Sequence, residues 1–298
     1  MTKILSFSLL FLFLFSCKQK VDEIPETATS GILKIAFDES YLPLVRQEID
    51  IFHYLYKYAT VLDTVVSQEK SHELFLKDSV KLIFSSRNLN SNEIAYLKAK
   101  KVFPKIYEFA QDGLVLIVHP ASKDSVFKIH TLSNLVSVEN SKAILVVDNA
   151  SGASITSFAE LVGIPKERIK NVFSAENTLG VIDYVSKNTN AIGLIASEWI
   201  SDTDNPKVQE VLKQVKIAKL LGPKSDEAFG PFQSEIADSL YPFKRKLYII
   251  SRETKMGIAN GFASFLLGEK GQRVVLKSGT LPIKVPSREV VISKKSVY

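Results

Sequence analysis

Short β-rich runs alternate with amphipathic runs along most of this chain, and this alternation constrains the fold more than any other feature. Apolar, β-branched runs at 31–37, 59–66 and 80–84 predict buried strands. After the first of these, apolar residues at three- and four-residue spacing predict a helix with one packed face: Leu42, Val45, Ile49, Phe52 and Tyr56. Strand, polar turn and helix in repeated order are typical of a layered α/β domain.

The alternation restarts in the middle of the chain, which predicts a second lobe. A strand at 143–147, a polar turn at 148–152 and a helix ended by Gly163 repeat the arrangement of the first unit. We expect 201–207 to be an exposed loop and 215–221 to be a further strand. The predicted fold is therefore α/β, with two lobes that each hold a mainly parallel sheet between helices.

Two predicted strands connect the lobes. The runs 102–109 and 114–119 flank the polar residues Gln111-Asp112-Gly113, where we expect a turn, and the second run is apolar enough to pass between two lobes. The run 240–250 predicts the returning strand. The predicted lobes are 31–117 plus 246–298, and 118–245, with a hinge near 114–119 and 247–250.

The N-terminus has the pattern of a lipoprotein signal. Lys3 precedes an apolar run at 4–15, and Leu14-Phe15-Ser16-Cys17 resembles a lipobox, which predicts removal of residues 1–16 and a lipid on Cys17. A dozen apolar residues span roughly 18 Å as a helix, less than a hydrocarbon core of about 30 Å. Residues 17–30 are predicted to form a tether. The alternative is an ordinary cleaved signal beside a coincidental cysteine.

The composition describes an exported globular protein held together by packing. Hydrophobic residues make up 46% of the chain and charged residues 23%, and Cys17 is the only cysteine, so no disulfide supports the fold. The net charge of +6 fits an anionic ligand, but Lys and Arg are scattered, which favours a solvated basic surface. No basic patch with interleaved aromatic residues indicates nucleic-acid binding. We expect a monomer in the cell envelope, facing the periplasm or the cell exterior.

Three polar turns follow predicted strands, and at least two of them open a helix. Backbone N–H groups and the positive end of a helix dipole then face the same gap, so such turns bind anions. In an open α/β sheet they gather outside the carboxyl ends of the strands. The candidate ligand-binding residues are Asp38, Glu39, Ser40, Ser85, Ser86, Arg87, Asp148, Ser151, Gly152, Ala153 and Ser154.

Each turn also has a simpler interpretation. Ser40, Asp148 and Ser151 are ordinary helix caps by residue type, and an arginine after a strand, such as Arg87, is often a surface ion-pair former. Gly152 lets a bound group approach the backbone. The presence of three such turns at matching positions is what favours a site for a tetrahedral oxyanion.

Evidence for an enzyme is thin. The four histidines, His53, His72, His119 and His130, have no HxxH or HExxH spacing, and no GxSxG, P-loop or GxGxxG motif occurs. We therefore expect no catalytic residue, no metal and no cofactor.

The C-terminal third resembles the phosphate-binding proteins of phosphate ABC importers. The shared pattern is Tyr241-Pro242, a basic residue and Leu247-Tyr248 on the returning strand, an Ala/Phe-rich run at 261–267, Gly271-Gln272, and Gly279-Thr280-Leu281-Pro282. The resemblance extends loosely over 31–285 and implies the two-lobed type II periplasmic-binding-protein fold. Divergent, phosphate-receptor-like lipoproteins of Bacteroidota-type bacteria are most similar, through Asp38-Glu39-Ser40 and 190–199.

The resemblance assigns roles to some of the candidate residues. It implies that Ser40 contacts the phosphate and that Ser151-Gly152-Ala153 matches the family's Ser-Gly-Thr. Two positions depart from the family: Val147 stands where it has an arginine, and Ser86 where it has an aspartate that accepts the proton of hydrogen phosphate. We hypothesise that Arg87 replaces the cation and that Asp38 or Asp148 replaces the acceptor.

These observations predict a non-enzymatic lipoprotein that binds phosphate, or a related tetrahedral oxyanion, between two lobes and delivers it to an ABC permease. Because the departures from the family lie in the site itself, one alternative is a receptor for another oxyanion or for a phosphorylated small molecule. A second alternative is a structural or signalling lipoprotein that kept the fold without transport.

Overall fold

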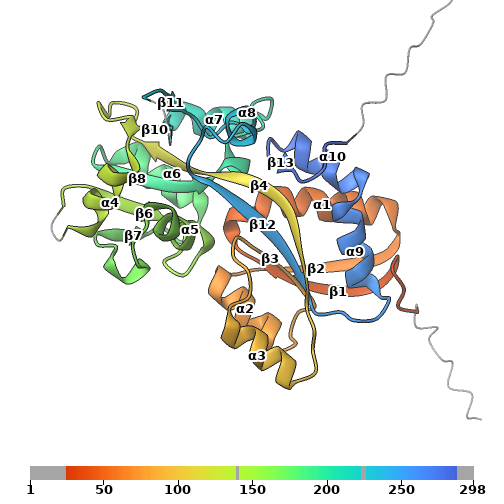
Figure 1. The fold of residues 1–298 in the computed structure, drawn as a ribbon. Coiled ribbons are helices and arrows are strands. Elements are labelled where there is room, and N and C mark those ends of the chain that lie inside the picture. The colour runs from red at the N-terminus through yellow and green to blue at the C-terminus, as the bar shows by residue number, and fades with distance from the viewer. Residues whose placement is uncertain (1–24, 139–140, 223–225, 287–298) are drawn as a thin grey trace, which may run out of the picture.

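The chain folds into two lobes that lie side by side and are joined by long strands (Figure 1). The structure is a computed structural model and describes residues 25–138, 141–222 and 226–286. Cys17, the predicted signal peptide and most of the predicted tether lie outside these residues. Among the described residues no helix is long and apolar enough to cross a membrane.

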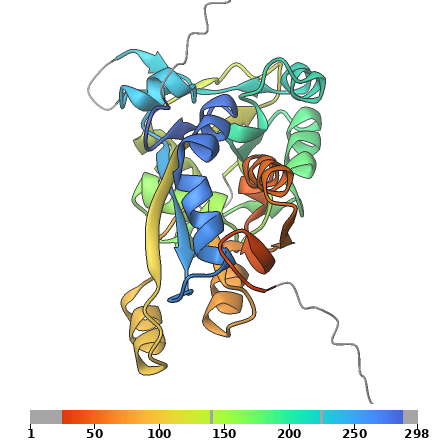
Figure 2. The same cartoon turned by 90° about the vertical axis from the view of Figure 1, so that its right-hand side faces the viewer.

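Lobe 1 is built from the first third of the chain and its C-terminal helices. Its sheet is covered on one face by α1, α9 and α10 and on the other by α2 and α3 (Figures 1 and 2). Leu33, Ile35 and Phe37 point to the first face and Ala36 to the second, as the alternation of a strand requires. The elements are β1 (Ser30–Phe37), η1 (Glu39–Tyr41), α1 (Leu42–Leu55), β2 (Tyr58–Val65), α2 (Gln68–Leu76), β3 (Leu82–Ser85), α3 (Ser91–Ala99), α9 (Ile258–Leu267), α10 (Glu269–Lys277) and β13 (Leu281–Pro282).

Lobe 2 is formed by the middle of the chain. Its sheet separates two apolar clusters, one under α4 and α5 and the other under α6 and α7. The α5 helix ends, as predicted, at Gly163, whose φ of 72° is left-handed. The elements are β5 (Val126–Phe127), α4 (Ile129–Ser137), β6 (Ile144–Val147), α5 (Ala153–Val162), η2 (Lys166–Arg168), β7 (Val172–Ser174), α6 (Thr178–Lys187), β8 (Ala191–Ala196), η3 (Ser197–Trp199), α7 (Pro206–Gln214), β9 (Lys216–Ile217), β10 (Lys219–Leu221), β11 (Ala228–Phe229) and α8 (Gln233–Ala237).

Two antiparallel strands pass between the lobes. β4 (Lys105–Val118) pairs with β12 (Lys244–Ser251) over much of its length, and its C-terminal half pairs with β8 in lobe 2. The strand order is β2-β1-β3-β12-β4-β8-β6-β7, so β4 belongs to the sheets of both lobes. Any movement of one lobe against the other must bend this pair of strands (Figure 1).

The type II periplasmic-binding-protein architecture is as predicted, and so are most elements. A capping box starts α3: the Asn90 side chain accepts from the Glu93 N–H, and the Glu93 carboxylate accepts from the Asn90 N–H.

Some local predictions are wrong. Gln111-Asp112-Gly113 lies inside β4 and forms no turn, because Asp112 is buried against Arg245 of the neighbouring strand. Residues 215–221 form two short strands, since β9 pairs with β4 whereas β10 pairs with β5 and β11. The helices α2 and α7 were not predicted, and α7 begins inside the expected 201–207 loop. The 240–250 strand starts only at Lys244.

Candidate functional site

The first polar turn places a carboxylate between the lobes. β1 ends at Phe37, and Asp38 follows in an extended conformation as the N-cap of η1. Its Oδ1 accepts hydrogen bonds from the Ser40 N–H at 3.2 Å and from the Ser40 hydroxyl at 2.7 Å. Asp38 is only 1% exposed, so these donors replace water around its carboxylate.

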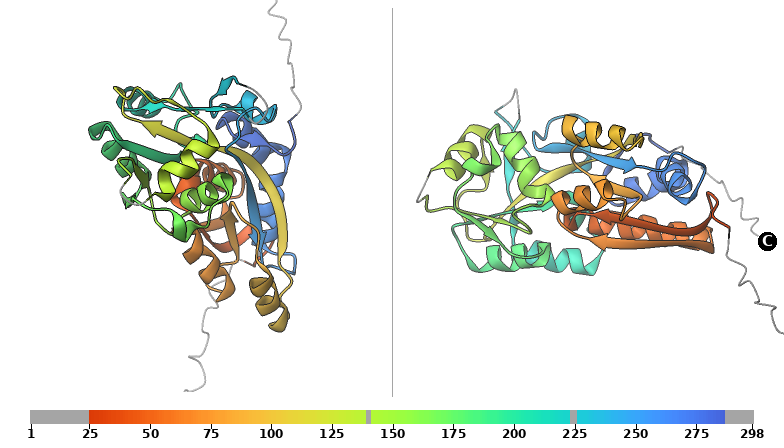
Figure 3. Two further views of the ribbon diagram at one scale, coloured as in Figure 1. Left: turned by 60° about the vertical axis from the view of Figure 1, so that its left-hand side comes forward. Right: turned by 90° about the horizontal axis from the view of Figure 1, so that it is seen from below.

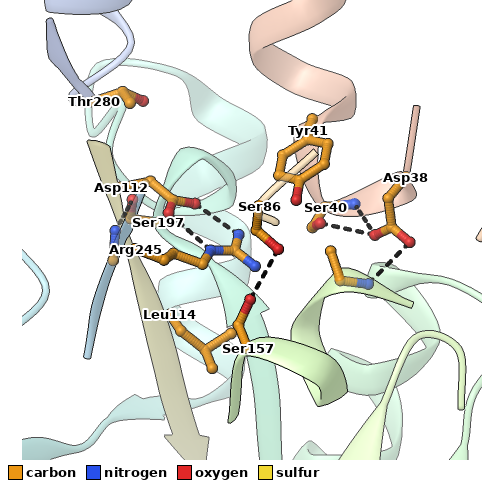
Figure 4. Close-up of polar contacts among 12 residues, drawn as sticks. Asp38, Ser40, Tyr41, Ser86, Asp112, Leu114, Ser157, Ser197, Arg245 and Thr280 are labelled. Atoms are coloured by element: carbon orange, nitrogen blue, oxygen red, sulfur yellow. Dashed lines mark hydrogen bonds and ion pairs between the residues drawn. The ribbon is translucent and has the colours of Figure 1, made fainter. Parts of the chain in front are cut away.

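Two helix N-termini complete the coordination of Asp38. Its Oδ2 accepts from the Gln68 N–H at 2.9 Å and from the Ala153 N–H at 3.0 Å. Gln68 is the first residue of α2 in lobe 1, and Ala153 is the first residue of α5 in lobe 2, so the positive ends of two helix dipoles meet at this oxygen. We call these donors, the N–H groups of Ser40, Gln68 and Ala153 with the Ser40 hydroxyl, the Asp38 cradle. Figure 4 shows Asp38 with the Ser40 donors.

Gly152 lies beside the cradle. A Cβ atom at this position would be 3.2 Å from Asp38 Oδ2 and 3.0 Å from the Asn149 carbonyl oxygen. Such contacts are tight for a carbon atom, so the glycine keeps the approach to the start of α5 open.

Further contacts cross from one lobe to the other around the cradle. The Ser86 and Ser157 hydroxyls are 3.0 Å apart, and the Glu69 N–H donates to the Ser151 carbonyl. Lys166 of lobe 2 forms an ion pair with Glu69 of lobe 1. The view from below shows α2 and α5 facing each other across this boundary (Figure 3). The structure is therefore a closed conformation.

The carboxamide of Gln68 organises the lobe 1 side of the site. Its Oε1 lies 2.9 Å from the Ser86 N–H and 3.0 Å from the Ser86 hydroxyl. The hydroxyls of Ser85 and Tyr41 also donate to it, at 3.2 and 3.3 Å. Gln68 thus fixes the start of the turn after β3 relative to the start of α2.

A buried arginine supplies the cation of the site. Arg245 of β12 pairs with Asp112 of β4 through two hydrogen bonds, Nε to Oδ1 at 2.7 Å and Nη2 to Oδ2 at 2.6 Å. The guanidinium lies 5.6 Å from the centre of the Tyr41 ring. Its Nη1 is buried and has no hydrogen-bond partner among the described residues. Figure 4 shows the guanidinium between Asp112 and Ser86, turned toward the space that the Ser86 and Ser157 hydroxyls share.

Two more acidic side chains are buried near this cation. Asp148 is 2% exposed and neither of its oxygens has a hydrogen-bond partner in the described part of the chain. Burial and, after it, the negative charge of Asp38 raise the pKa of Asp148 to about 7. Burial and the charge of Asp112 likewise raise the pKa of Glu198 well above its ordinary value. Burial raises the pKa of Asp38 as well, and hydrogen bonds from Ser40 and Ala153 oppose this rise.

Arg87 points to a different partner. Its guanidinium binds both oxygens of Glu93, at 2.8 Å each, and donates to the Asn88 carbonyl. Burial opposes ionisation of Glu93, but hydrogen bonds from Arg87 and His72 lower its pKa well below the ordinary value. The hypothesis that Arg87 is the cation of an anion site stays a prediction, and in this closed conformation Arg87 forms an ion pair instead.

The other predicted site residues surround the cradle in different ways. Glu39 is half-buried, and its carboxylate accepts from the Thr178 N–H at the start of α6 in lobe 2. The Ser85 hydroxyl lies 2.9 Å from His72 Nε2. Ser154 is buried in the first turn of α5. The structure therefore brings the first and third turns together and places Ser86 of the second turn between them.

Several residues of the site escaped the sequence analysis: Gln68, Asp112, Ser157, Glu198 and Arg245. Gln68 was missed because α2 was, although Ser67 is an N-cap by type and caps the helix in the structure. Arg245 was noted only as a basic residue in the shared C-terminal pattern. The signal that points to it is its position on a returning strand whose partner strand carries a buried aspartate.

Comparison with known proteins fits this architecture. The model of a PBP superfamily domain matches residues 23–270. The chain belongs to this superfamily. No protein with a curated description matches the chain.

Solved structures show the same fold. One is a substrate-binding protein assigned to phosphate ABC transport from Clostridium perfringens, with bound phosphate, at a TM-score of 0.71 and 18% identity, covering 85% of this chain and all of that one. An ABC-type phosphate transport receptor from Vibrio cholerae has a TM-score of 0.65 and 18% identity over 85% of this chain and all of its own. A possible phosphate binding protein from Planctomyces limnophilus has a TM-score of 0.59 and 19% identity over 86% of this chain and 94% of its own.

These solved structures are named as phosphate-binding or phosphate-transport proteins, and this chain shares their fold and the superfamily of the matching family model. In the part of the chain that the structure describes, no group of three or more His, Cys, Asp or Glu side chains is arranged to hold a metal ion.

Proposed function

We propose that this protein is a lipoprotein that closes its two lobes around a tetrahedral oxyanion, inorganic phosphate first, and presents it to an ABC permease. The observation that carries the proposal is the Asp38 cradle, where N–H groups from both lobes converge on one pair of anionic oxygens. Donors arranged in this way stabilise a negative charge at the boundary between the lobes. An anion bound there would couple ligand binding to lobe closure.

The surroundings of the cradle supply the other groups that a phosphate needs. Arg245 contributes a positive charge, and its Nη1 has no hydrogen-bond partner among the described residues. The Ser86 and Ser157 hydroxyls line the space in front of it. Asp148 is a buried carboxyl to which no other side chain in the described part of the chain donates a hydrogen bond. When ionised, it would accept the proton of hydrogen phosphate, which sulfate lacks, and so would favour phosphate.

The relatives support the ligand and the partner. Three structural relatives carry names that refer to phosphate binding or transport, and two of them to ABC transport. A lipid on Cys17 and a tether over residues 17–30 would keep the protein near a membrane permease while the lobes move.

Titration calorimetry of the purified protein with phosphate, sulfate and arsenate tests the proposal. We expect heat with phosphate and weaker or no heat with sulfate. Binding of none of the three anions would contradict the oxyanion assignment.

A proline variant tests the cradle itself. Ala153→Pro deletes the N–H that faces the anion, at the first position of α5, where a helix tolerates proline. Loss of one charge-assisted hydrogen bond, about 1.5–3 kcal/mol, lowers affinity by roughly tenfold or more, and by less to the extent that Asp38 uses the same N–H in the unbound protein. Ser91→Pro makes the same change at the first position of α3 and should leave affinity unaltered.

A groove beside the cradle favours one second candidate, a receptor for a phosphorylated small molecule. The groove lies between the lobes, has a volume of about 640 Å³, and is lined by Gln68, Glu69, Arg87, Thr156 and Lys166 among others. Gln68 belongs to both the groove and the cradle, so a phosphoryl group in the cradle could carry a polar substituent into the groove. Tighter binding of glycerol phosphate than of inorganic phosphate would favour this candidate.

A further inference from the structure

Asp38 already takes the hydrogen bonds that an anionic ligand of the cradle would need. Its two oxygens accept from the Ser40 N–H, the Ser40 hydroxyl, the Gln68 N–H and the Ala153 N–H. Resting on the proposed oxyanion function, we infer that Asp38 is a built-in competitor: its carboxylate occupies the cradle in the ligand-free protein, and an external oxyanion binds there by displacing it.

Local helix capping does not account for these contacts. As the N-cap of η1, Asp38 needs only the bond from the Ser40 N–H. The bonds from Gln68 and Ala153 come from residues 30 and 115 positions away, and the second belongs to the other lobe. They place the carboxylate on two helix N-termini that would otherwise hold unsatisfied N–H groups.

The contact with Ala153 also links the lobes. Together with the Ser86–Ser157 hydrogen bond and the Glu69–Lys166 ion pair, it holds the two lobes against each other. Asp38 thus supplies the negative charge that holds the start of α5 against lobe 1. A competing ligand has to replace this contact with a stronger one.

On the opposite side of the site, Arg245 has a hydrogen-bond donor that Asp38 does not contact. A ligand that binds more strongly than Asp38 has to contact this donor. Arg245 Nη1 is buried and finds no hydrogen-bond partner within residues 25–138, 141–222 and 226–286, and its side chain is only 4% exposed. A carboxylate tethered to β1 uses both oxygens on the cradle and has none left for this donor. A tetrahedral oxyanion has oxygens to reach the cradle and Arg245 at once, so it gains a charge-assisted hydrogen bond that Asp38 cannot make.

This arrangement makes Asp38 a specificity-determining residue. A ligand with a single carboxylate would replace the hydrogen bonds of Asp38 in the cradle with an equal set, so it would gain little binding free energy. Ligands with three or four anionic oxygens would gain the contact with Arg245. The site is therefore selective for tetrahedral oxyanions or phosphoryl groups, at the expense of affinity.

Three variants test the inference by calorimetry with inorganic phosphate. Asp38→Ala empties the cradle and should bind phosphate at least tenfold more tightly than the wild type. Asp38→Asn keeps a carbonyl oxygen for the N–H groups of Gln68 and Ala153 but carries no charge and turns its NH₂ toward Ser40, so it competes less well and phosphate should bind more tightly by a smaller factor. Asp50→Ala removes the same charge from an exposed position on α1 and should stay within twofold of the wild type.

Small-angle scattering without ligand gives an independent readout. Asp38→Ala loses the bond to Ala153, so we expect a larger radius of gyration than for the wild type, which phosphate reverses. Tighter binding without this opening would show that Asp38 acts through its charge alone, and would overturn the competitor role.

The remaining outcomes separate this inference from the proposed function. If the wild type binds phosphate and Asp38→Ala binds it no more tightly, the inference is wrong while the oxyanion function stands. If neither the wild type nor the folded variants bind phosphate, the proposed function fails and the inference with it. If Asp38→Ala does not fold, the affinity of Asp38→Asn decides.

Discussion

Asp112 and Asp38 are both buried in the site between the lobes, but their negative charges are satisfied in opposite ways. Asp112 is 0% exposed and pairs with Arg245, which faces it directly in the register of β4 and β12. Asp38 is 1% exposed and accepts N–H groups from separate elements, one of them in the other lobe. The first pair moves as one unit when the lobes move, whereas the second set of bonds breaks.

The Asp112–Arg245 pair therefore has a structural role and Asp38 a functional one, although both lie in the same cleft. A pair whose partners sit on neighbouring strands stabilises the hinge in every conformation. A carboxylate whose donors come from both lobes stabilises only the closed form, and another anion can replace it. The predictions below test this division, beginning with the largest effect.

Removing Asp112 should have the largest effect on stability. Asp112→Ala leaves Arg245 buried without its anion, which costs about 3–5 kcal/mol of the free energy of unfolding. Glu108→Ala, on the same strand, breaks the exposed ion pair with Lys246 and should leave the free energy of unfolding nearly unchanged, because solvent screens the pair. Urea denaturation measures both, and equal losses would contradict the structural role of the Arg245–Asp112 pair.

The raised pKa of Asp148 should make the stability of the protein depend on pH. In the folded protein its pKa is about 7, whereas its ordinary value is 3.8, a difference of about three pKa units. Between these values the unfolded chain binds fewer protons than the folded one, so the free energy of unfolding falls as the pH rises from about 4 to about 7, by up to about 4 kcal/mol.

Asp148→Asn should remove this decline, because an amide does not titrate. Denaturation of wild type and variant at several pH values measures the difference, and Asp204→Asn, at an exposed position, is the control. Parallel stability profiles for wild type and Asp148→Asn would show that Asp148 keeps its ordinary pKa.

The two arginines of the cleft should differ in their effect on phosphate binding. Arg245→Lys keeps the charge but loses the planar group that reaches Asp112 and the ligand space together, and should lower affinity by about tenfold, or about 1.4 kcal/mol. Arg87→Lys changes an arginine that is paired with Glu93, and should change affinity by less than about threefold. The reverse order would restore the original assignment of Arg87 as the ligand cation.

The smallest effect is expected at the edge of the cleft. Lys166→Ala breaks the partly exposed ion pair with Glu69, which contributes about 0–1 kcal/mol to closure and less at high salt. Phosphate titrations at low and high ionic strength measure this contribution. A larger loss of phosphate affinity that persists at high salt would mean that lobe closure depends on the Lys166–Glu69 pair and not on the cradle.

The sequence predicts the architecture well because periodicity reports burial. The strands over 31–37 and 143–147 were placed to within a residue, and the end of α5 followed from Gly163. The α2 helix escaped because its sequence is mostly polar and its apolar spacing is weak. The turn predicted at Asp112 was wrong for a related reason: a polar residue in a strand looks like a turn unless its buried partner is known.

The site was predictable only in part. Residue types at the ends of β1 and β6 pointed to Asp38, Ser40 and Ala153, and the structure brings them together. No local pattern shows that Arg245 would meet Asp112, since 133 positions separate them. Nor does any pattern show that the carboxylate of Asp38 would itself fill the cradle, because that depends on how the two lobes close.

A crystal structure of Asp38→Ala grown with phosphate tests the central claim most directly. The account predicts a phosphate between the lobes, with oxygens within hydrogen-bond distance of the Gln68 and Ala153 N–H groups and of Arg245. A phosphate bound elsewhere, or a closed cleft with only water in the cradle, would contradict it.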